Sequence, residues 1–120
     1  MIDPLVLPLT WSVVTLGRVT KIIMGQAPEG SSYNEEEIGL PLVAGAGDLG
    51  DINPQPKKWT SSPTQICKTG DLIYCIRATI GEMNWADREY CVGRGVAAIR
   101  ANANVLMPDF MYFWLSIIKD

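Results

Sequence analysis

"KTGDLIYCIRATIGEMNWA", residues 68–86, is the stretch that decides the fold. It begins with a Gly-Asp turn and continues as an apolar run, rich in strand-forming residues, from Leu72 to about Arg77. The chain then bends near Gly81 and resumes as a second short run over 82–85. Turn residues that separate short runs of this kind predict two strands joined by a tight connection.

A cation, Arg77, ends the first of these strands. Period-two alternation places it on the face of Ile73 and Cys75, so it either caps an apolar face or reaches outward. One interpretation is a structural ion pair with Glu82 or Asp71. The other is a planar donor fork aimed at a phosphate or at a guanine edge.

A second arginine stands in a similar place further along the chain. In "YCVGRGVAAIR", residues 90–100, Arg94 lies between Gly93 and Gly95, within one or two predicted strands. The glycines predict a bulge or a close approach of two backbone segments, and they leave room for a ligand. The structural and the ligand-binding interpretations are both open here. Two strands that each carry such a cation favour an anionic ligand.

The segments before this stretch are more irregular. Residues 1–9 are expected to be a loose leader, because two prolines interrupt regular structure. Residues 10–25, "TWSVVTLGRVTKIIMG", predict a strand, a short turn of helix, or both. A short strand at Leu42–Ala44 is followed by a long loop that glycine and proline punctuate. Long loops of this kind are often functional, so recognition is expected there.

The end of that loop combines cations, hydroxyls and an aromatic ring. Lys57 and Lys58 precede Trp59, and Thr60 and Ser61 follow it. Lysines and hydroxyls are common phosphate contacts, which position a duplex without reading its sequence. The alternative is a plain solvated surface.

The last segment, "MPDFMYFWLSIIKD" (residues 107–120), predicts a helix. Pro108 suits the first helical position, and apolar residues recur at helical spacing on nearly every side. Such a helix is either part of a core or covered by a second molecule. The predicted fold is therefore α+β, with a twisted, mostly antiparallel or mixed β-sheet of short strands, long loops and a C-terminal aromatic-rich helix.

Composition sets the broad class. The chain has 120 residues, of which 48% are hydrophobic, which predicts a single domain over 1–120 and excludes general disorder. No apolar run approaches the roughly 20 residues of a membrane-spanning helix, and the N-terminus lacks the pattern of a signal peptide. These features predict a cytoplasmic protein with no membrane partner.

Charge and cysteine content limit which ligands and which catalytic or metal sites the chain can have. The net charge of −3 argues against nucleic acid, but residues 57–120 carry eight of the ten cations. The chain has no histidine and three cysteines without metal-ligand spacing, which excludes the usual zinc sites and histidine-based triads. Cys75 and Cys91 are expected to be buried, reduced thiols. A Cys-dependent hydrolase is a rival interpretation, but we expect no catalytic, cofactor or metal site.

Five segments in this order resemble the target recognition domain of type I restriction-modification specificity subunits. They are "WSVVTLGRV", "MGQAP", "GLPLVAGAGDLGD", "KKWTSSPTQICKTGDLIYCIRATIGEMNWA" and "CVGRGVAAIRA". The resemblance runs from about Trp11 to the end of the chain. It implies a non-enzymatic reader of double-stranded DNA. In that family two such domains, separated by long helices, each recognise half of a split target, and the subunit assembles with methyltransferase and nuclease subunits.

The resemblance also implies which parts face DNA: residues 25–28, the loop over 44–62, residues 77–79 and Arg94. The predicted DNA-binding side chains are Gln26, Lys57, Lys58, Thr60, Ser61, Arg77, Thr79 and Arg94.

One feature departs from the family pattern. Family domains continue beyond the aromatic helix into further strands and a spacer helix, whereas this sequence stops at Asp120. This predicts a truncated domain whose exposed apolar surface drives self-association. A rival hypothesis is a remnant that acts as a protein-interaction or regulatory module through Phe113, Trp114 and Ile117 of the apolar C-terminal helix.

Overall fold

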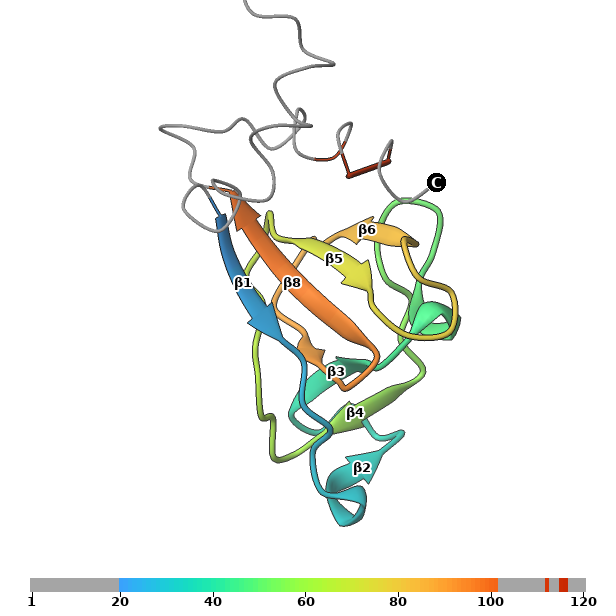
Figure 1. The fold of residues 1–120 in the computed structure, drawn as a ribbon. Coiled ribbons are helices and arrows are strands. Elements are labelled where there is room, and N and C mark those ends of the chain that lie inside the picture. The colour runs from blue at the N-terminus through green and yellow to red at the C-terminus, as the bar shows by residue number, and fades with distance from the viewer. Residues whose placement is uncertain (1–19, 102–111, 113–114, 117–120) are drawn as a thin grey trace, which may run out of the picture.

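The computed structural model describes residues 20–101, 112, 115 and 116. Regular structure over residues 20–101 consists of short strands and two 3-10 turns (Figure 1). In chain order these are β1 (Thr20–Met24), η1 (Gly30–Ser32), β2 (Tyr33–Asn34), β3 (Leu40–Val43), η2 (Ala46–Asp48), β4 (Lys58–Thr60), β5 (Leu72–Cys75), β6 (Met83–Trp85), β7 (Cys91–Val92) and β8 (Val96–Ala101).

The strands form two four-stranded sheets. The first has the order β1-β8-β5-β6 and is antiparallel throughout. The second has the order β2-β4-β3-β7, in which β3 and β7 run parallel and the other pairs antiparallel. The longest strand, β8, is central in the first sheet, where Ile99 pairs with Ile22 on one side and Leu72 on the other.

The main core combines side chains from both sheets. Ile73 and Val96 from the first sheet pack with Val43 and Val92 from the second, and all four are fully buried. Alternation along β5 turns Leu72 to the opposite face. The residues that pack on that outer face with Leu72 are Ile99, Leu115, Tyr74, Met83, Trp85 and Ala101.

The α+β prediction is wrong. The described residues hold two sheets rather than one, and they include no helix of seven or more residues. Tyr112, Leu115 and Ser116 are helical, but the rest of the predicted C-terminal helix lies outside the described residues. Leu115 is buried on the outer face of the first sheet, and Tyr112 stacks on Trp85 with ring centroids 5.5 Å apart.

The predicted bounds of the other elements agree only in part with the structure. A strand forms within residues 10–25, over Thr20–Met24, and the Leu42–Ala44 strand is found at Leu40–Val43. The run from Leu72 ends at Cys75 rather than Arg77, and β4 interrupts the predicted long loop. The leader at 1–9 and the side chains of Phe113, Trp114 and Ile117 lie outside the described residues. In the part that is described, no helix is long and apolar enough to cross a membrane.

Candidate nucleic-acid interface

The connection between β5 and β6 presents Arg77 at the surface. Its backbone is closed by a hydrogen bond from the Gly81 N–H to the Cys75 carbonyl (3.1 Å). Two residues have positive φ, Ala78 at 53° and Gly81 at 98°. A left-handed alanine is uncommon and persists only where its surroundings determine the conformation. The loop is therefore a fixed turn, and we call residues 76–82 the arginine loop.

The Arg77 side chain is exposed and forms no hydrogen bond or ion pair with the residues that the structure describes. The structural interpretation, an ion pair of Arg77 with Asp71 or Glu82, is therefore not supported among the described residues, and Asp71 pairs with Arg100 instead. Thr79, in the same loop, is also exposed. The guanidinium of Arg77 is free to bind an external acceptor.

Arg94 lies in the turn between β7 and β8, beside the arginine loop. The N–H of Ile76 donates to the carbonyl oxygen of Gly95 (2.9 Å), so Arg77 and Arg94 are each one residue from the same hydrogen bond. Arg94 is exposed and, like Arg77, has no side-chain partner within the described ranges. Two arginines with unpaired side chains are thus carried by backbone segments that are hydrogen-bonded to each other.

Glycines allow four backbone segments to meet at this turn. The N–H of Gly93 donates to Val43 (2.8 Å), and that of Gly25 donates to Val96 (3.0 Å). A Cβ atom on Gly25 would stand 1.8 Å from the Gly93 oxygen, and one on Gly95 would stand 2.3 Å from the oxygen of Ala44. The predicted close approach of the backbone is confirmed.

The same junction positions Gln26. Its N–H donates to the carbonyl oxygen of Val92 (3.0 Å), and its own carbonyl oxygen accepts from the Thr64 hydroxyl (2.5 Å). The Gln26 side chain is exposed next to the turn that carries Arg94. The fold therefore brings together the backbone segments that carry Gln26, Arg77, Thr79 and Arg94.

The long segment between β3 and β4 is held in place by amide side chains. Asn84, buried in β6, donates to the Gly50 carbonyl (3.0 Å) and accepts from the Gly50 N–H (2.9 Å). Asn53 donates to the carbonyl of Trp85 (2.7 Å), whose N–H in turn donates to Ile52 (2.8 Å). The segment is thus a preformed surface docked on the edge of the first sheet.

The remaining candidates lie on and around β4. Lys57 is exposed and its Nζ donates to the Gly47 carbonyl (3.0 Å), while the ammonium of Lys58 lies 6.0 Å from the ring centroid of Tyr33. Ser61 is exposed. Thr60 is fully buried and its hydroxyl is 2.7 Å from that of Ser32, so it does not face a ligand at the surface.

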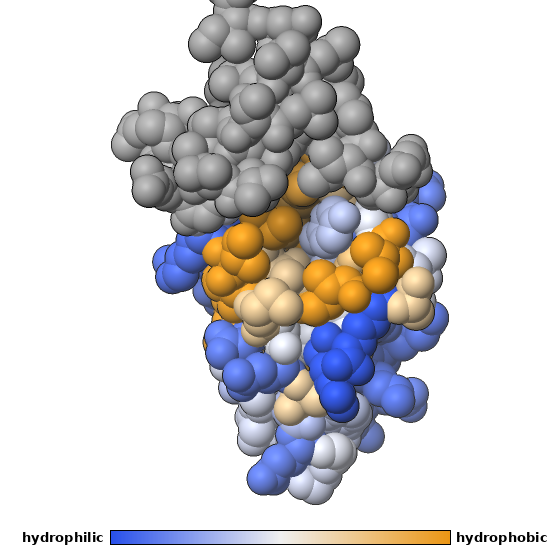
Figure 2. All heavy atoms as spheres, viewed as in Figure 1, coloured by the Kyte–Doolittle hydropathy of each residue, from blue (hydrophilic) through white to orange (hydrophobic). Residues whose placement is uncertain are grey.

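The surface around the arginine loop has both hydrophilic and apolar parts. Strongly hydrophilic surface lies directly beside apolar surface over the end of β5 and the start of β8 (Figure 2). A surface that mixes cations with apolar groups can contact both the phosphates and the base edges of a duplex.

Comparison with known proteins identifies the family. Residues 8–120 match the model of the type I restriction modification DNA specificity domain. The chain belongs to that family. It is 39% identical over 115 residues to a Methanocaldococcus jannaschii protein described as the MjaX type I restriction enzyme specificity subunit. That alignment covers 94% of this chain and 27% of the relative.

Two solved structures have the same fold as this specificity domain. The HsdS subunit of Thermoanaerobacter tengcongensis superposes with a TM-score of 0.84 at 40% identity, over 88% of this chain and 27% of that one. A chain from a study of the assembly and conformational transition of the type I R-M system superposes with a TM-score of 0.79 at 40% identity. That match covers 85% of this chain and 26% of the other. The specificity domain thus spans about a quarter of the length of its relatives.

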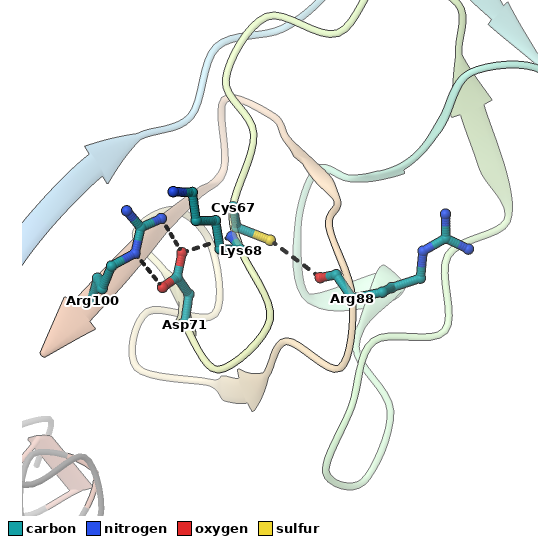
Figure 3. Close-up of polar contacts among 5 residues, drawn as sticks. All are labelled: Cys67, Lys68, Asp71, Arg88 and Arg100. Atoms are coloured by element: carbon teal, nitrogen blue, oxygen red, sulfur yellow. Dashed lines mark hydrogen bonds and ion pairs between the residues drawn. The ribbon is translucent and has the colours of Figure 1, made fainter.

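A buried ion pair, which the sequence did not reveal, ties the specificity domain's Gly-Asp turn to β8. Arg100 donates through Nε and Nη2 to the two carboxylate oxygens of Asp71, each at 2.8 Å (Figure 3). Asp71 is 1% exposed, and it also accepts from the Lys68 N–H (2.8 Å). These hydrogen bonds raise the pKa of Arg100. Both carboxylate oxygens are thus engaged in hydrogen bonds inside the fold.

Cys75 and Cys91 of the specificity domain are buried free thiols, as predicted, and Cys67 is a third. Burial raises the pKa of Cys67 to about 11, and burial also raises that of Cys75. The Cys67 thiol donates to the Arg88 carbonyl (3.8 Å; Figure 3). Nucleophilic cysteines have lowered pKa values and access to solvent, so these thiols do not support the hydrolase hypothesis.

Proposed function

We propose that this chain is a target recognition domain that binds double-stranded DNA in a sequence-specific manner, as part of a type I restriction-modification specificity subunit. The observation that carries the proposal is the pair of exposed, unpartnered arginines at the hydrogen-bonded junction of the arginine loop and the β7–β8 turn. Family membership supports DNA as the ligand.

The geometry divides the contacts into two groups. Arg77 and Arg94 have free donor forks on turns fixed by backbone hydrogen bonds, which suits bidentate recognition of guanine or phosphate. Gln26 and Thr79 add amide and hydroxyl groups beside them. Lys57, Lys58 and Ser61, near β4, would contact phosphates and set the register of the duplex.

The proposal assigns no catalytic step to the domain. Chemistry would come from methyltransferase and restriction subunits that assemble with the complete specificity subunit. Support comes from the relatives: one is described as a type I restriction enzyme specificity subunit, and one solved structure comes from a study of complex assembly in the type I R-M system. Such a domain would work in the cytoplasm, on cellular DNA.

The experiment is selection from a randomised duplex pool at about 20 mM and about 150 mM salt, a range over which phosphate contacts weaken. The wild-type chain, Arg77→Ala and Arg94→Ala are compared with Arg88→Ala, which removes an exposed arginine outside the junction. We expect the wild type and Arg88→Ala to select one short motif and the two junction variants to lose it. Folded wild-type protein that selects no motif at either salt concentration would refute the proposal.

Lysine substitutions then separate base reading from phosphate binding. Lysine retains the charge but lacks the planar fork. If Arg77 contacts a guanine, Arg77→Lys should lose roughly 10-fold or more in affinity for the selected motif and keep its non-specific affinity. If it contacts a phosphate, Arg77→Lys should bind the motif nearly as well as the wild type, and Arg77→Ala should reduce the salt slope by about 1.

A further inference from the structure

Ile80, at the tip of the arginine loop, has a side chain that the fold does not use. It is 64% exposed and belongs to neither buried cluster. Exposure alone does not single it out, because Ile38 is 57% exposed in the turn before β3. Isolated apolar residues at a surface are common and need no special explanation.

The surroundings distinguish the two isoleucines. Ile38 follows three exposed glutamates, Glu35–Glu37, which would repel a polyanion. Ile80 lies instead in a loop that also exposes Arg77 and Thr79. An apolar side chain that lies beside hydrogen-bond donors suits a ligand with an anionic backbone and with apolar groups between its anionic groups.

Backbone hydrogen bonds close the loop around Ile80. Residues with positive φ, Ala78 and Gly81, stand on either side of the Thr79–Ile80 pair. The Glu82 N–H donates to the Thr79 carbonyl (3.3 Å), and the Gly81 N–H donates to Cys75 (3.1 Å). These bonds hold the tip closed, so little ordering entropy would be lost when it enters a groove.

Double-stranded DNA offers one apolar group on its base edges, the C5-methyl group of thymine in the major groove. We infer that Ile80 contacts a thymine methyl group close to the base or phosphate that Arg77 contacts, and so reads a T·A pair. The inference rests on the proposed function, because it assumes that the arginine loop enters DNA.

The test replaces each thymine of the selected motif, one at a time, by deoxyuridine, which lacks only the methyl group. For the wild-type chain and for Ile38→Ala, we expect affinity to fall about fourfold at one or two positions, the value for one buried methyl group. Ile80→Ala should bind the unmodified motif about as weakly as the wild type binds the deoxyuridine duplex. It should show no further loss on the same replacement.

The outcomes separate the two ideas. If the wild type selects no motif, the proposed function fails and this inference fails with it. If it selects a motif but Ile80→Ala keeps the wild-type sensitivity to deoxyuridine, the inference alone is overturned. If Ile80→Ala weakens thymine and deoxyuridine duplexes equally and the wild type is insensitive to the methyl group, Ile80 is an apolar wedge between bases instead. That result also overturns methyl reading.

Discussion

The Asp71–Arg100 ion pair gives the sharpest stability prediction. Arg100→Ala removes two hydrogen bonds of 2.8 Å from a carboxylate that is 1% exposed. Only the Lys68 N–H would remain as a described donor to that carboxylate. Removal of one partner of a buried pair costs about 3–5 kcal/mol, because the other charge stays buried without compensation. Since the Arg100 side chain is 27% exposed and water can reach the site, we expect about 3 kcal/mol.

The neutral variant Asp71→Asn supplies the critical comparison. Its amide oxygen can still accept from the Lys68 N–H, and the partly exposed Arg100 can be hydrated. A buried neutral amide costs less than an unpaired carboxylate. We therefore expect the double variant Asp71→Asn/Arg100→Ala to be more stable than Arg100→Ala alone, by roughly 1 kcal/mol.

Urea unfolding followed by tryptophan fluorescence measures each free energy of unfolding, with Arg88→Ala as the control for an exposed arginine. The control should lie within about 0.5 kcal/mol of the wild type. A loss of about 3 kcal/mol should also lower the Tm of Arg100→Ala by roughly 10 °C. The reasoning is refuted if Arg100→Ala costs under about 1 kcal/mol, or if the double variant is no more stable than Arg100→Ala.

Three further predictions test the core and the junction. Gly25→Ala should cost about 3 kcal/mol in urea unfolding because its Cβ meets backbone oxygen, whereas Gly45→Ala, with nothing within 4 Å, should be nearly neutral. The raised pKa of Cys67 means that its stabilising contribution is complete below about pH 9 and falls as pH rises toward about 11. Between these pH values the free energy of unfolding, measured by urea titration at each pH, should therefore decline by up to about 1.4 kcal/mol per pH unit. The decline should be smaller in Cys67→Ala. Asn84→Ala should cost about 1–3 kcal/mol and speed amide hydrogen exchange at Gly50; unchanged exchange would contradict the proposed anchoring.

Local sequence patterns predicted the central strands well and their assembly poorly. The alternation over 72–76 located β5, and its flanking Gly-Asp turn located its start. The split into two sheets depends on pairings such as that of β3 with β7, which joins Leu42 to Cys91 across the chain. No local period encodes such a pairing, so a single sheet was a natural but wrong expectation.

At the candidate site, too, the sequence did not predict contacts between residues far apart in the chain. The exposed arginines were visible because a cation interrupts an apolar run, but the partner of Asp71 was not, since Arg100 is 29 residues away in the chain. The burial of Thr60 was not foreseen, because β4 turns its hydroxyl inward against that of Ser32. An asparagine among the apolar residues 83–86 was the sequence signal that could have pointed to Asn84, because a buried amide needs hydrogen-bond partners.

The fold separates residues that build the interface from residues that would use it. The Asp71–Arg100 pair and Gly25 act through contacts inside the protein, so their loss must reduce stability along with any binding. Among the described residues, Arg77 and Arg94 form no side-chain hydrogen bond or ion pair, so no polar interaction of the fold depends on either guanidinium group. A binding defect at full stability in those two variants would therefore reflect lost ligand contacts rather than a damaged scaffold.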